Sequence, residues 1–298
     1  MTARGAARGA ARASALVALG ACCFGSISVL TVVGTRDGTS LSTLLAWRYL
    51  PGALLLLLVA PPSRARLPLG QAARLLVLGG AGQAAVSFVS LSALRWIPAG
   101  ALGFLFYTYP TWVAVLAVVR RTEHVDRRRV AALALSFGGI ALMVGSPWAA
   151  PLPWQGVALA LAAAFGYALY VPYLHRIESE TTPAVASTYV TAGAGLAFLG
   201  AAIADGTFGV AFAPATWAAV AGLALLCTFV AFLAFLRGLA TLGPVRTAIV
   251  STVEPFWTSV LGVALLGQPL SATTLVGGAL IGTAVLLLQL PTRERAAA

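Results

Sequence analysis

Glu254 is the acidic residue that falls in the middle of a long apolar segment of this chain. If that segment crosses a membrane, a charge near its centre costs at least about 2.5–3.5 kcal/mol, so the carboxyl group must face a cavity, be protonated or be paired. Two functional roles are then open, binding of a substrate amine and coupling to protons. The structural alternative is a carboxylate that is hydrogen-bonded beside the helix break that Pro255 makes.

Other polar side chains occur at similar depth in neighbouring apolar segments. Arg48 could hold a substrate carboxylate through its planar guanidinium, or its long side chain could reach the outer interface. Gln83, Ser87 and Ser90 follow one another at i, i+4 and i+7, which predicts one polar helix face. That face either contributes to a binding site, with Gln83 as the candidate residue, or forms hydrogen bonds between helices of about 0.6 kcal/mol each.

Aromatic residues gather in three of the apolar segments. Tyr107, Tyr109 and Trp112 lie in one segment, Tyr167 in a second and Trp257 in a third. Tyrosine and tryptophan normally concentrate at the membrane interfaces, and at mid-depth their O–H or N–H group needs a partner. These residues therefore predict either the wall of a substrate cavity or a well-packed core.

Four prolines also lie inside apolar segments, namely Pro51, Pro110, Pro172 and Pro255. Each frees a backbone carbonyl four residues earlier and can kink its helix. They are candidate hinges for a movement between two conformations, and a static bend is the alternative.

The composition of the whole chain places these residues in a membrane. Of its 298 residues, 60% are hydrophobic and 9% are charged. A soluble domain has about 25% charged residues, so this composition excludes a soluble globular enzyme and a disordered chain. It predicts an all-α integral membrane protein. Ten apolar runs have lengths that fit bilayer spans, at 14–34, 42–60, 72–95, 98–119, 129–146, 153–175, 183–203, 214–236, 243–265 and 272–290.

The arginines predict the orientation of these spans. All 19 basic residues are arginine, and all but three of them flank the spans on the side of the N-terminus. Because positive residues concentrate in cytoplasmic loops, the N-terminus and the C-terminus are both predicted to be cytoplasmic. Anionic lipid at the helix ends accounts for the net charge of +11, so no nucleic-acid partner is predicted.

Missing residue types exclude several chemistries. Without lysine, the chain has neither a Walker A loop nor a lysine that could form a Schiff base. His124 and His175 are too few and too far apart for a metal or haem site, so no metal and no cofactor are predicted. An intramembrane enzyme needs paired acids, a metal cluster or a Ser–His pair inside the membrane, which these spans lack. We therefore expect that the chain is not an enzyme, and an intramembrane enzyme is the least favoured alternative.

The two halves of the chain resemble each other. Phe24-Gly25 corresponds to Phe165-Gly166, Pro98 to Pro244, and Pro110-Thr111-Trp112 to Pro255-Phe256-Trp257, at a nearly constant offset. We therefore expect a first five-helix repeat over 1–148 and a second five-helix repeat over 149–298. Because five is an odd number, the second repeat must be inverted in the membrane. Inverted repeats are typical of secondary transporters, whose substrate site lies near the midplane.

Several of the same motifs resemble a known family. The chain is similar to the EamA family of the drug/metabolite transporter superfamily in Phe24-Gly25, the Ala93-Leu94…Pro98-Ala99 hairpin, Tyr107-x-Tyr109-Pro110, Gly243-Pro244 and Glu254-Pro255. The family's Gly-Glu after the fourth and ninth spans is replaced here by Thr122-Glu123 and Gly267-Gln268. The resemblance implies a ten-helix bundle, alternating access, and export of small metabolites such as amino acids, including aromatic or hydrophobic ones.

The location and the partners follow from composition and from this resemblance. Abundant alanine and the absence of lysine indicate a bacterial gene rich in G and C. We therefore expect a multi-pass protein of the bacterial inner membrane, with lipid and a small-molecule substrate as its partners. Import, and transport of a purine, a sugar or a cationic drug, stay open as alternatives. Proton coupling and the oligomeric state are open as well.

Overall fold

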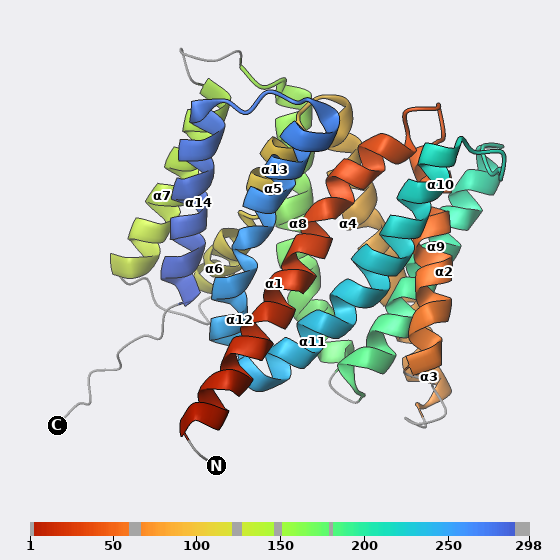
Figure 1. The fold of residues 1–298 in the computed structure, drawn as a ribbon, viewed down its shortest axis with the longest axis horizontal. Helices are drawn as coiled ribbons and strands as arrows, with labels where there is room; N and C mark the ends of the chain where they lie inside the picture. Colours follow the sequence, from red (N-terminus) through yellow and green to blue (C-terminus); the bar gives the residue numbers. More distant parts are fainter. Residues whose placement is uncertain (1–2, 60–66, 121–126, 146–150, 179–180, 290–298) are drawn as a thin grey trace.

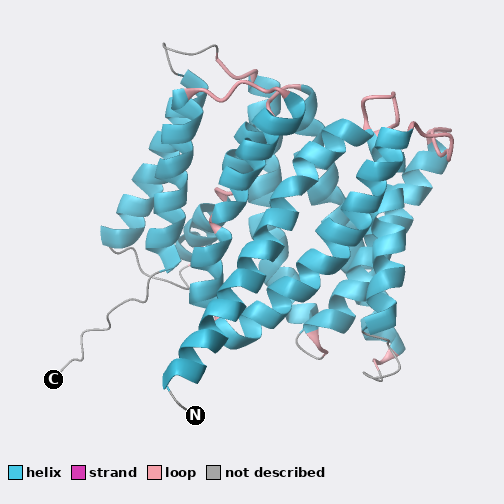
Figure 2. Cartoon of the chain, in the orientation of Figure 1, coloured by secondary structure: helices cyan, strands magenta, loops and turns pink. Residues whose placement is uncertain are grey.

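The chain forms a bundle of helices, as its composition predicts (Figures 1 and 2). The computed structural model describes residues 3–59, 67–120, 127–145, 151–178 and 181–289, and no strand occurs within these ranges. The helices before residue 148 are α1 Ala3–Gly34, α2 Leu41–Val59, α3 Leu69–Arg74, η2 Leu75–Gly79, α4 Gly80–Ser92, η3 Ala93–Arg95, α5 Ala99–Phe106, α6 Tyr109–Val119 and α7 Arg127–Gly145. Those after it are α8 Trp154–Glu178, α9 Pro183–Ala204, α10 Pro214–Ala221, η4 Gly222–Val230, α11 Ala231–Leu242, α12 Pro244–Ser251, α13 Val253–Leu266 and α14 Ala272–Gln289.

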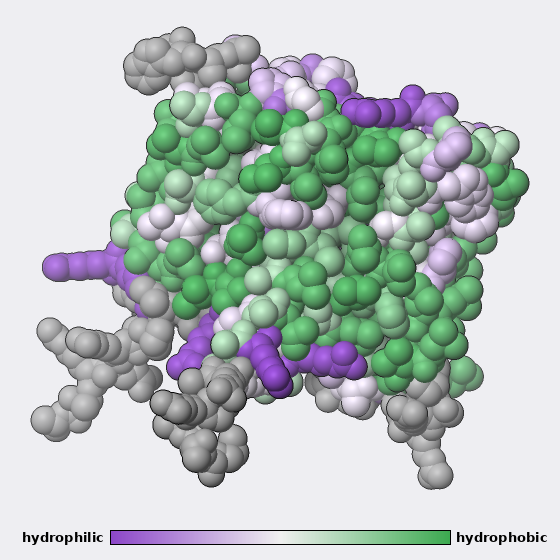
Figure 3. Space-filling view, in the orientation of Figure 1, coloured by the Kyte–Doolittle hydropathy of each residue, from purple (hydrophilic) through white to green (hydrophobic). Residues whose placement is uncertain are grey.

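The helices are long and apolar enough for several passes through a membrane. In the described part of the chain, eight helical stretches meet both criteria, each of at least 18 residues. The two other predicted spans, 129–146 and 272–290, coincide with α7 and α14, whose apolar stretches Val130–Val144 and Ala272–Leu288 are shorter. Hydrophobic side chains cover the middle of the visible face, and hydrophilic ones gather toward its two ends (Figure 3). The protein is therefore a multi-pass membrane protein.

The packing pairs helices from before residue 148 with helices from after it. The main pairs are α7 with α14, α2 with α9, α1 with α11, α5 with α13, and α4 with both α8 and α9. The N-terminal end of α1 and the C-terminal end of α14 lie at the same end of the bundle (Figure 1). The two halves of the chain are thus interleaved rather than folded as two separate bundles.

The predicted spans 98–119 and 243–265 are each divided into two helices near their middle, close to Pro110 and Pro255, where the sequence predicts a kink or a break. The first breaks between α5 and α6, where the Thr108 hydroxyl donates to the Leu105 carbonyl at 2.7 Å. The second breaks between α12 and α13, where the Thr252 hydroxyl donates to the Ile249 carbonyl at the same distance. A backbone polar group left free by a break needs such a local partner inside a membrane.

The four prolines consequently differ in their surroundings. Pro51 and Pro172 lie inside the continuous helices α2 and α8. Pro110 and Pro255 lie in the first turn of the helix that follows a break, where a missing N–H costs nothing. The third and eighth predicted spans stay helical throughout but contain the π-helical turns η2 and η4.

Candidate functional site

A cavity of about 610 Å³ lies between the helices of the two halves. Its lining comes from α1, α2, α4, α5, α6, α8, α9, η4, α11, α12 and α13, whereas no described residue of α7, α10 or α14 contributes. The lining reaches Leu56 near the C-terminal end of α2, Leu239 near that of α11, and Thr247 in α12. These parts of the three helices lie toward the end of the bundle that holds the N-terminal end of α1 (Figure 1). The volume is within the usual range for a small-molecule site, about 300–1,000 Å³.

Six of the eight candidate binding residues line this cavity. The structure brings together Glu254, Arg48, Gln83, Tyr107, Tyr109 and Tyr167. Trp112 and Trp257 are not among the lining residues. Polar groups from five helices and from the break between α5 and α6 therefore meet at one place, as a substrate site requires.

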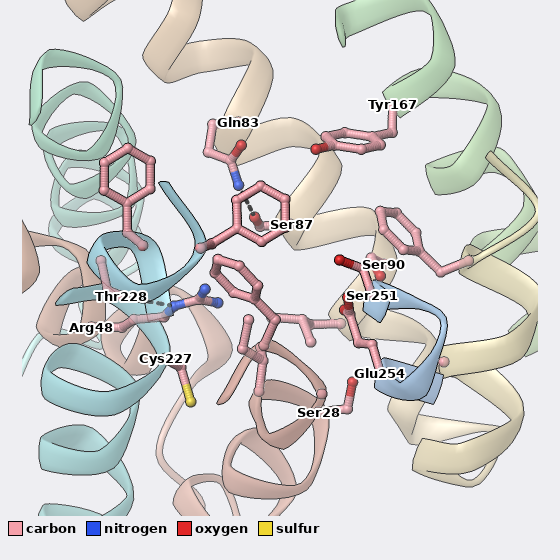
Figure 4. A pocket seen from close by; sticks show the side chains of 18 of the residues that line it. Ser28, Arg48, Gln83, Ser87, Ser90, Tyr167, Cys227, Thr228, Ser251 and Glu254 are labelled. Carbon is pink, nitrogen blue, oxygen red and sulfur yellow. Dashed lines mark hydrogen bonds between the residues drawn. The ribbon is translucent and has the colours of Figure 1, made fainter. Parts of the chain in front are cut away.

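Glu254 lies in the first turn of α13, directly after the break at Thr252. A carboxylate there is favoured by the unpaired N–H groups and the positive dipole end of the helix. Its side chain points into the cavity, on the same side as Ser251 and Ser28 (Figure 4). No described residue donates a hydrogen bond to this carboxylate or forms an ion pair with it. The carboxyl group is therefore open to a ligand or a proton.

A tight seam between α1 and α13 fixes the position of Glu254. The Thr258 hydroxyl lies 2.7 Å from the Gly25 carbonyl and 3.0 Å from the Glu254 carbonyl. The Trp257 indole N–H donates to the Ser26 hydroxyl at 3.1 Å. Trp257 thus holds α13 against α1 and is not among the residues that line the cavity.

Arg48 lies on the opposite side of the cavity from Glu254 in Figure 4, beside Cys227 and Thr228. Its side chain is only 6% exposed, and it lines the cavity rather than reaching the outer interface. Its Nε lies 3.5 Å from the Thr228 hydroxyl, and its guanidinium carbon lies 4.6 Å from the centre of the Tyr49 ring. The Arg48 side chain therefore touches both halves of the chain.

A small hydrogen-bond network lies next to Arg48. The Tyr49 hydroxyl and the Ser87 hydroxyl are 2.7 Å apart, and the Gln83 amide donates to both, at 3.2 and 3.1 Å. This polar face of α4 therefore does two things. Gln83 and Ser87 hydrogen-bond α4 to α2, and both residues also line the cavity. Tyr49 also lines the cavity but is not among the residues predicted from the sequence, although its place directly after Arg48 could have pointed to it.

Beside the break between α5 and α6, one side of the cavity is an aromatic wall formed by Phe106, Tyr107, Tyr109 and Tyr167. The Tyr109 ring contacts the Tyr167 ring edge-to-face at 4.9 Å, and Tyr107 lies 6.0 Å from Tyr109. Phe106 lies 5.5 Å from Tyr167 and completes the wall. The Tyr109–Tyr167 contact joins α6 to α8, and its edge-to-face geometry is a favourable one for aromatic pairs.

Two residues of the predicted motifs have structural roles away from the cavity. Trp112 packs edge-to-face between Phe137 and Phe165, at 5.6 Å from each. The Gln268 side-chain oxygen accepts a hydrogen bond of 2.9 Å from the Ala99 N–H at the start of α5. Position 268 thus needs an acceptor oxygen, which glutamine supplies as well as glutamate does. Glu123 of the corresponding first-half motif lies outside the described residues.

The described residues contain no group of three or more His, Cys, Asp or Glu side chains that could hold a metal ion. His124 lies outside the described residues. The side chains of the cavity offer hydroxyls, one thiol, one amide, one carboxyl group and one guanidinium. This donor set can hydrogen-bond and pair with charges on a small organic molecule.

Comparison with known proteins shows a family and a fold. The EamA-like transporter family matches over residues 11–145 and again over residues 154–290. An uncharacterized transporter of Archaeoglobus fulgidus is 26% identical over 197 residues, which are 66% of this chain and 69% of that protein. A solved crystal structure of a protein with 17% sequence identity superposes with a TM-score of 0.62 over 92% of this chain and 95% of its own. The last match shows a shared fold alone.

Proposed function

This chain belongs to the EamA-like transporter family, and we propose that it exports a small metabolite through the central cavity by alternating access. It is a membrane transporter, so it works on a small molecule in a lipid environment. The observation that carries the proposal is the cavity itself. It gathers Glu254, Arg48 and an aromatic wall between the two halves of the chain, within apolar helices where such groups are costly.

The helix pairing supports an inverted repeat with five spans in each half. Exchanging each span with its counterpart turns α1 into α8, α2 into α9, and the α3–η2–α4 span into the α10–η4–α11 span. The same exchange turns the α5–α6 span into the α12–α13 span and α7 into α14. Under this exchange the contacts α2–α9, α5–α13 and α7–α14 stay the same, because each joins a span to its own counterpart. The contact between α1 and α11 becomes the contact between α8 and α4, which the structure also contains. We therefore place ten spans in two halves, over 1–148 and 149–298, which agrees with the two family matches.

Alternating access follows from such an arrangement. Two similar halves in opposite orientations give two conformations of similar energy, one open to each side of the membrane. The breaks at Thr108 and Thr252 and the π-helical turns η2 and η4 lie at corresponding places in the two halves. Broken helices and π-turns are common where transporters bind substrate or bend. Pro110 and Pro255, next to the breaks, are the hinges that this mechanism would use first.

The chemistry of the cavity favours an amino acid with an apolar or aromatic side chain. A hydrophobic side chain would pack on Tyr107, Tyr109 and Tyr167, and the ammonium group would approach Glu254. If Glu254 instead takes up and releases a proton in each transport cycle, it couples transport of the substrate to the proton gradient. A purine, a sugar or a cationic drug is the alternative substrate class.

The orientation stays as the arginines predict it. We place both termini in the cytoplasm of a bacterium and the protein in its inner membrane. The cavity lining extends toward the end of the bundle that holds the N-terminal end of α1. On this orientation the cavity faces the cytoplasm, as an exporter requires before it binds its substrate.

Transport in proteoliposomes tests this proposal. Purified protein is assayed for exchange and for net flux of labelled amino acids, with and without a pH gradient, and then of purines, sugars and cationic drugs. We expect flux of at least one solute, and each solute should be recovered chemically unchanged. Absence of flux across the whole panel, or chemical conversion of a solute, would contradict a transporter of this kind.

The variant Glu254→Gln separates the two roles of this carboxyl group. If Glu254 binds the substrate amine, the variant loses both exchange and net flux. If it couples to protons, exchange persists while the response to the pH gradient disappears. The matched control is Asp205→Asn, which removes an exposed carboxylate outside the cavity and should leave flux unchanged. Full activity of Glu254→Gln with an intact pH response would exclude both roles.

A further inference from the structure

Arg48 is a buried cation whose charge is not balanced by a neighbouring carboxylate. Its side chain is 6% exposed, and it is the one cationic residue among the described residues that line the cavity. Within the described part of the chain, its hydrogen-bond and cation–π partners are the Thr228 hydroxyl, at 3.5 Å, and the Tyr49 ring. No acidic side chain of the described residues forms an ion pair with it.

Such a group is costly to bury unless something binds it. A guanidinium has five N–H donors in a planar fork, and here only the Nε–H has a described partner. The two terminal nitrogens therefore leave a fork that can donate two parallel hydrogen bonds to a planar oxyanion. Figure 4 shows the guanidinium pointing into the cavity, on the side opposite Glu254. An anion that enters the cavity is thus the partner that this side chain lacks.

Neighbouring residues hold the guanidinium in place for this role. The Tyr49 ring lies against one face of it at 4.6 Å, and the Tyr49 hydroxyl is itself fixed by Ser87 and Gln83. On the other side, the Thr228 hydroxyl donates to the Leu223 carbonyl at 2.9 Å, across the π-helical turn η4. The Arg48 fork is therefore preorganised, with one support from each half of the chain.

We propose that Arg48 binds the carboxylate of the transported substrate, and that the protein therefore carries monocarboxylates and rejects solutes without this group. The inference rests on the proposed function, because it names the substrate class of the same cavity. A carboxylate is favoured over a phosphate or a dicarboxylate, since the cavity offers one cation and also holds Glu254, which repels a second negative charge. The substrate thus has one carboxylate and an apolar body that packs on the aromatic wall.

Binding measurements on detergent-purified full-length protein test the proposal without a transport step. The probes share a phenyl ring and differ in their charged groups: L-phenylalanine, its methyl ester, 3-phenylpropionate and 2-phenylethylamine. Titration calorimetry should show binding of the two carboxylates. The ester and the amine should bind at least about tenfold more weakly, because they cannot accept the paired hydrogen bonds.

Variants assign the effect to Arg48. Arg48→Gln should weaken binding of L-phenylalanine by about 10- to 100-fold and leave the weak binding of 2-phenylethylamine unchanged. Arg48→Lys should restore part of the affinity, since it keeps the charge but loses the fork. Thr228→Val is the matched control, because it removes the Nε contact and keeps the guanidinium, and it should cost less than Arg48→Gln. Size-exclusion chromatography checks that each variant is folded.

The outcomes separate this inference from the proposed function. Equal binding of acid and ester, unchanged binding of L-phenylalanine to folded Arg48→Gln, or no binding of either carboxylate to the wild type would each overturn the role of Arg48. The comparison of acid with ester uses the wild type, so it stands even if Arg48→Gln does not fold. Arg48-dependent binding without flux of any solute would refute transport and leave the carboxylate site intact.

Discussion

A Cβ atom at Gly25 would lie 2.7 Å from the backbone carbonyl oxygen of Glu254. Real Cβ atoms essentially never approach a neighbour this closely, so a side chain at position 25 would push α13 away from α1. The absence of a side chain in α1 thus sets where the carboxyl group of α13 enters the cavity. Gly25 acts on the site through packing, whereas Glu254 acts through its own chemistry.

Gly25→Ala should therefore destabilise the protein and impair the site together. Overpacking costs about 1–3 kcal/mol, and the added methyl group also meets the Thr258 hydroxyl at 2.9 Å. We expect a lower midpoint of thermal unfolding in detergent and reduced flux in proteoliposomes. Gly138→Ala is the control, because nothing lies within 4 Å of its added Cβ. Equal midpoints for the two variants would contradict the close packing.

Pro255→Ala should slow the transport cycle more than it weakens substrate binding. The substitution restores an N–H that can bond to the Ser251 carbonyl, so α12 and α13 can join into one helix. A straightened helix would resist the movement between the two states, and kcat should fall while KM changes little. Pro172→Ala, inside the continuous helix α8, is the comparison and should have the smaller effect on kcat. A larger effect at Pro172 would assign the hinge to α8 instead.

Gln268→Leu should destabilise the start of α5 by about 1 kcal/mol, since it removes the oxygen that accepts from the Ala99 N–H. Gln268→Glu keeps an acceptor at the same place and should be close to neutral. Thermal unfolding of the two variants alongside the wild type measures the difference. If the glutamate variant were the less stable of the two, the capping role of Gln268 would be wrong.

Asp37 should stabilise the contact between the loop after α1 and the start of α10 over a wide pH range. Hydrogen bonds from Thr39 and Thr216 hold the pKa of the Asp37 carboxyl group well below its usual value, and the Ala213 N–H adds a further bond. A carboxyl group with a lowered folded-state pKa stabilises the fold above its unfolded pKa, which is about 3.9, and loses that contribution as the pH falls further. The stabilisation is therefore complete at neutral pH.

Asp37→Asn should accordingly be less stable than the wild type at pH 7, by a constant margin down to about pH 5. The margin should shrink only below about pH 4, where the wild-type unfolded state takes up its proton. Unfolding midpoints measured from pH 3 to pH 8 test this. Thr216→Val, which removes one donor to Asp37, should show a smaller margin. A margin that grows as the pH falls would have the wrong sign for this interaction.

Much of this molecule follows from the sequence by itself. The apolar runs, their lengths and the proline and glycine positions are local properties, and in a membrane the backbone polar groups of a span must find partners within the protein, which favours helices. The position of Glu254 on its span, and the family to which the chain belongs, could therefore be predicted. Six of the eight candidate residues do line the cavity, because polar groups in apolar helices tend to face protein rather than lipid.

Tertiary structure alone decided which side chains meet. Sequence gives the depth of a residue along its helix, but the rotation of the helix about its axis depends on the neighbours against which it packs. Trp257 therefore turns to Ser26 rather than to the cavity, and Thr228 lies beside Arg48 although the two residues are far apart in the chain. At the breaks beside Thr108 and Thr252 the sequence supplies Pro110 and Pro255, whose missing N–H groups cannot bond back across the break, whereas the tertiary structure decides how the two helices on either side pack.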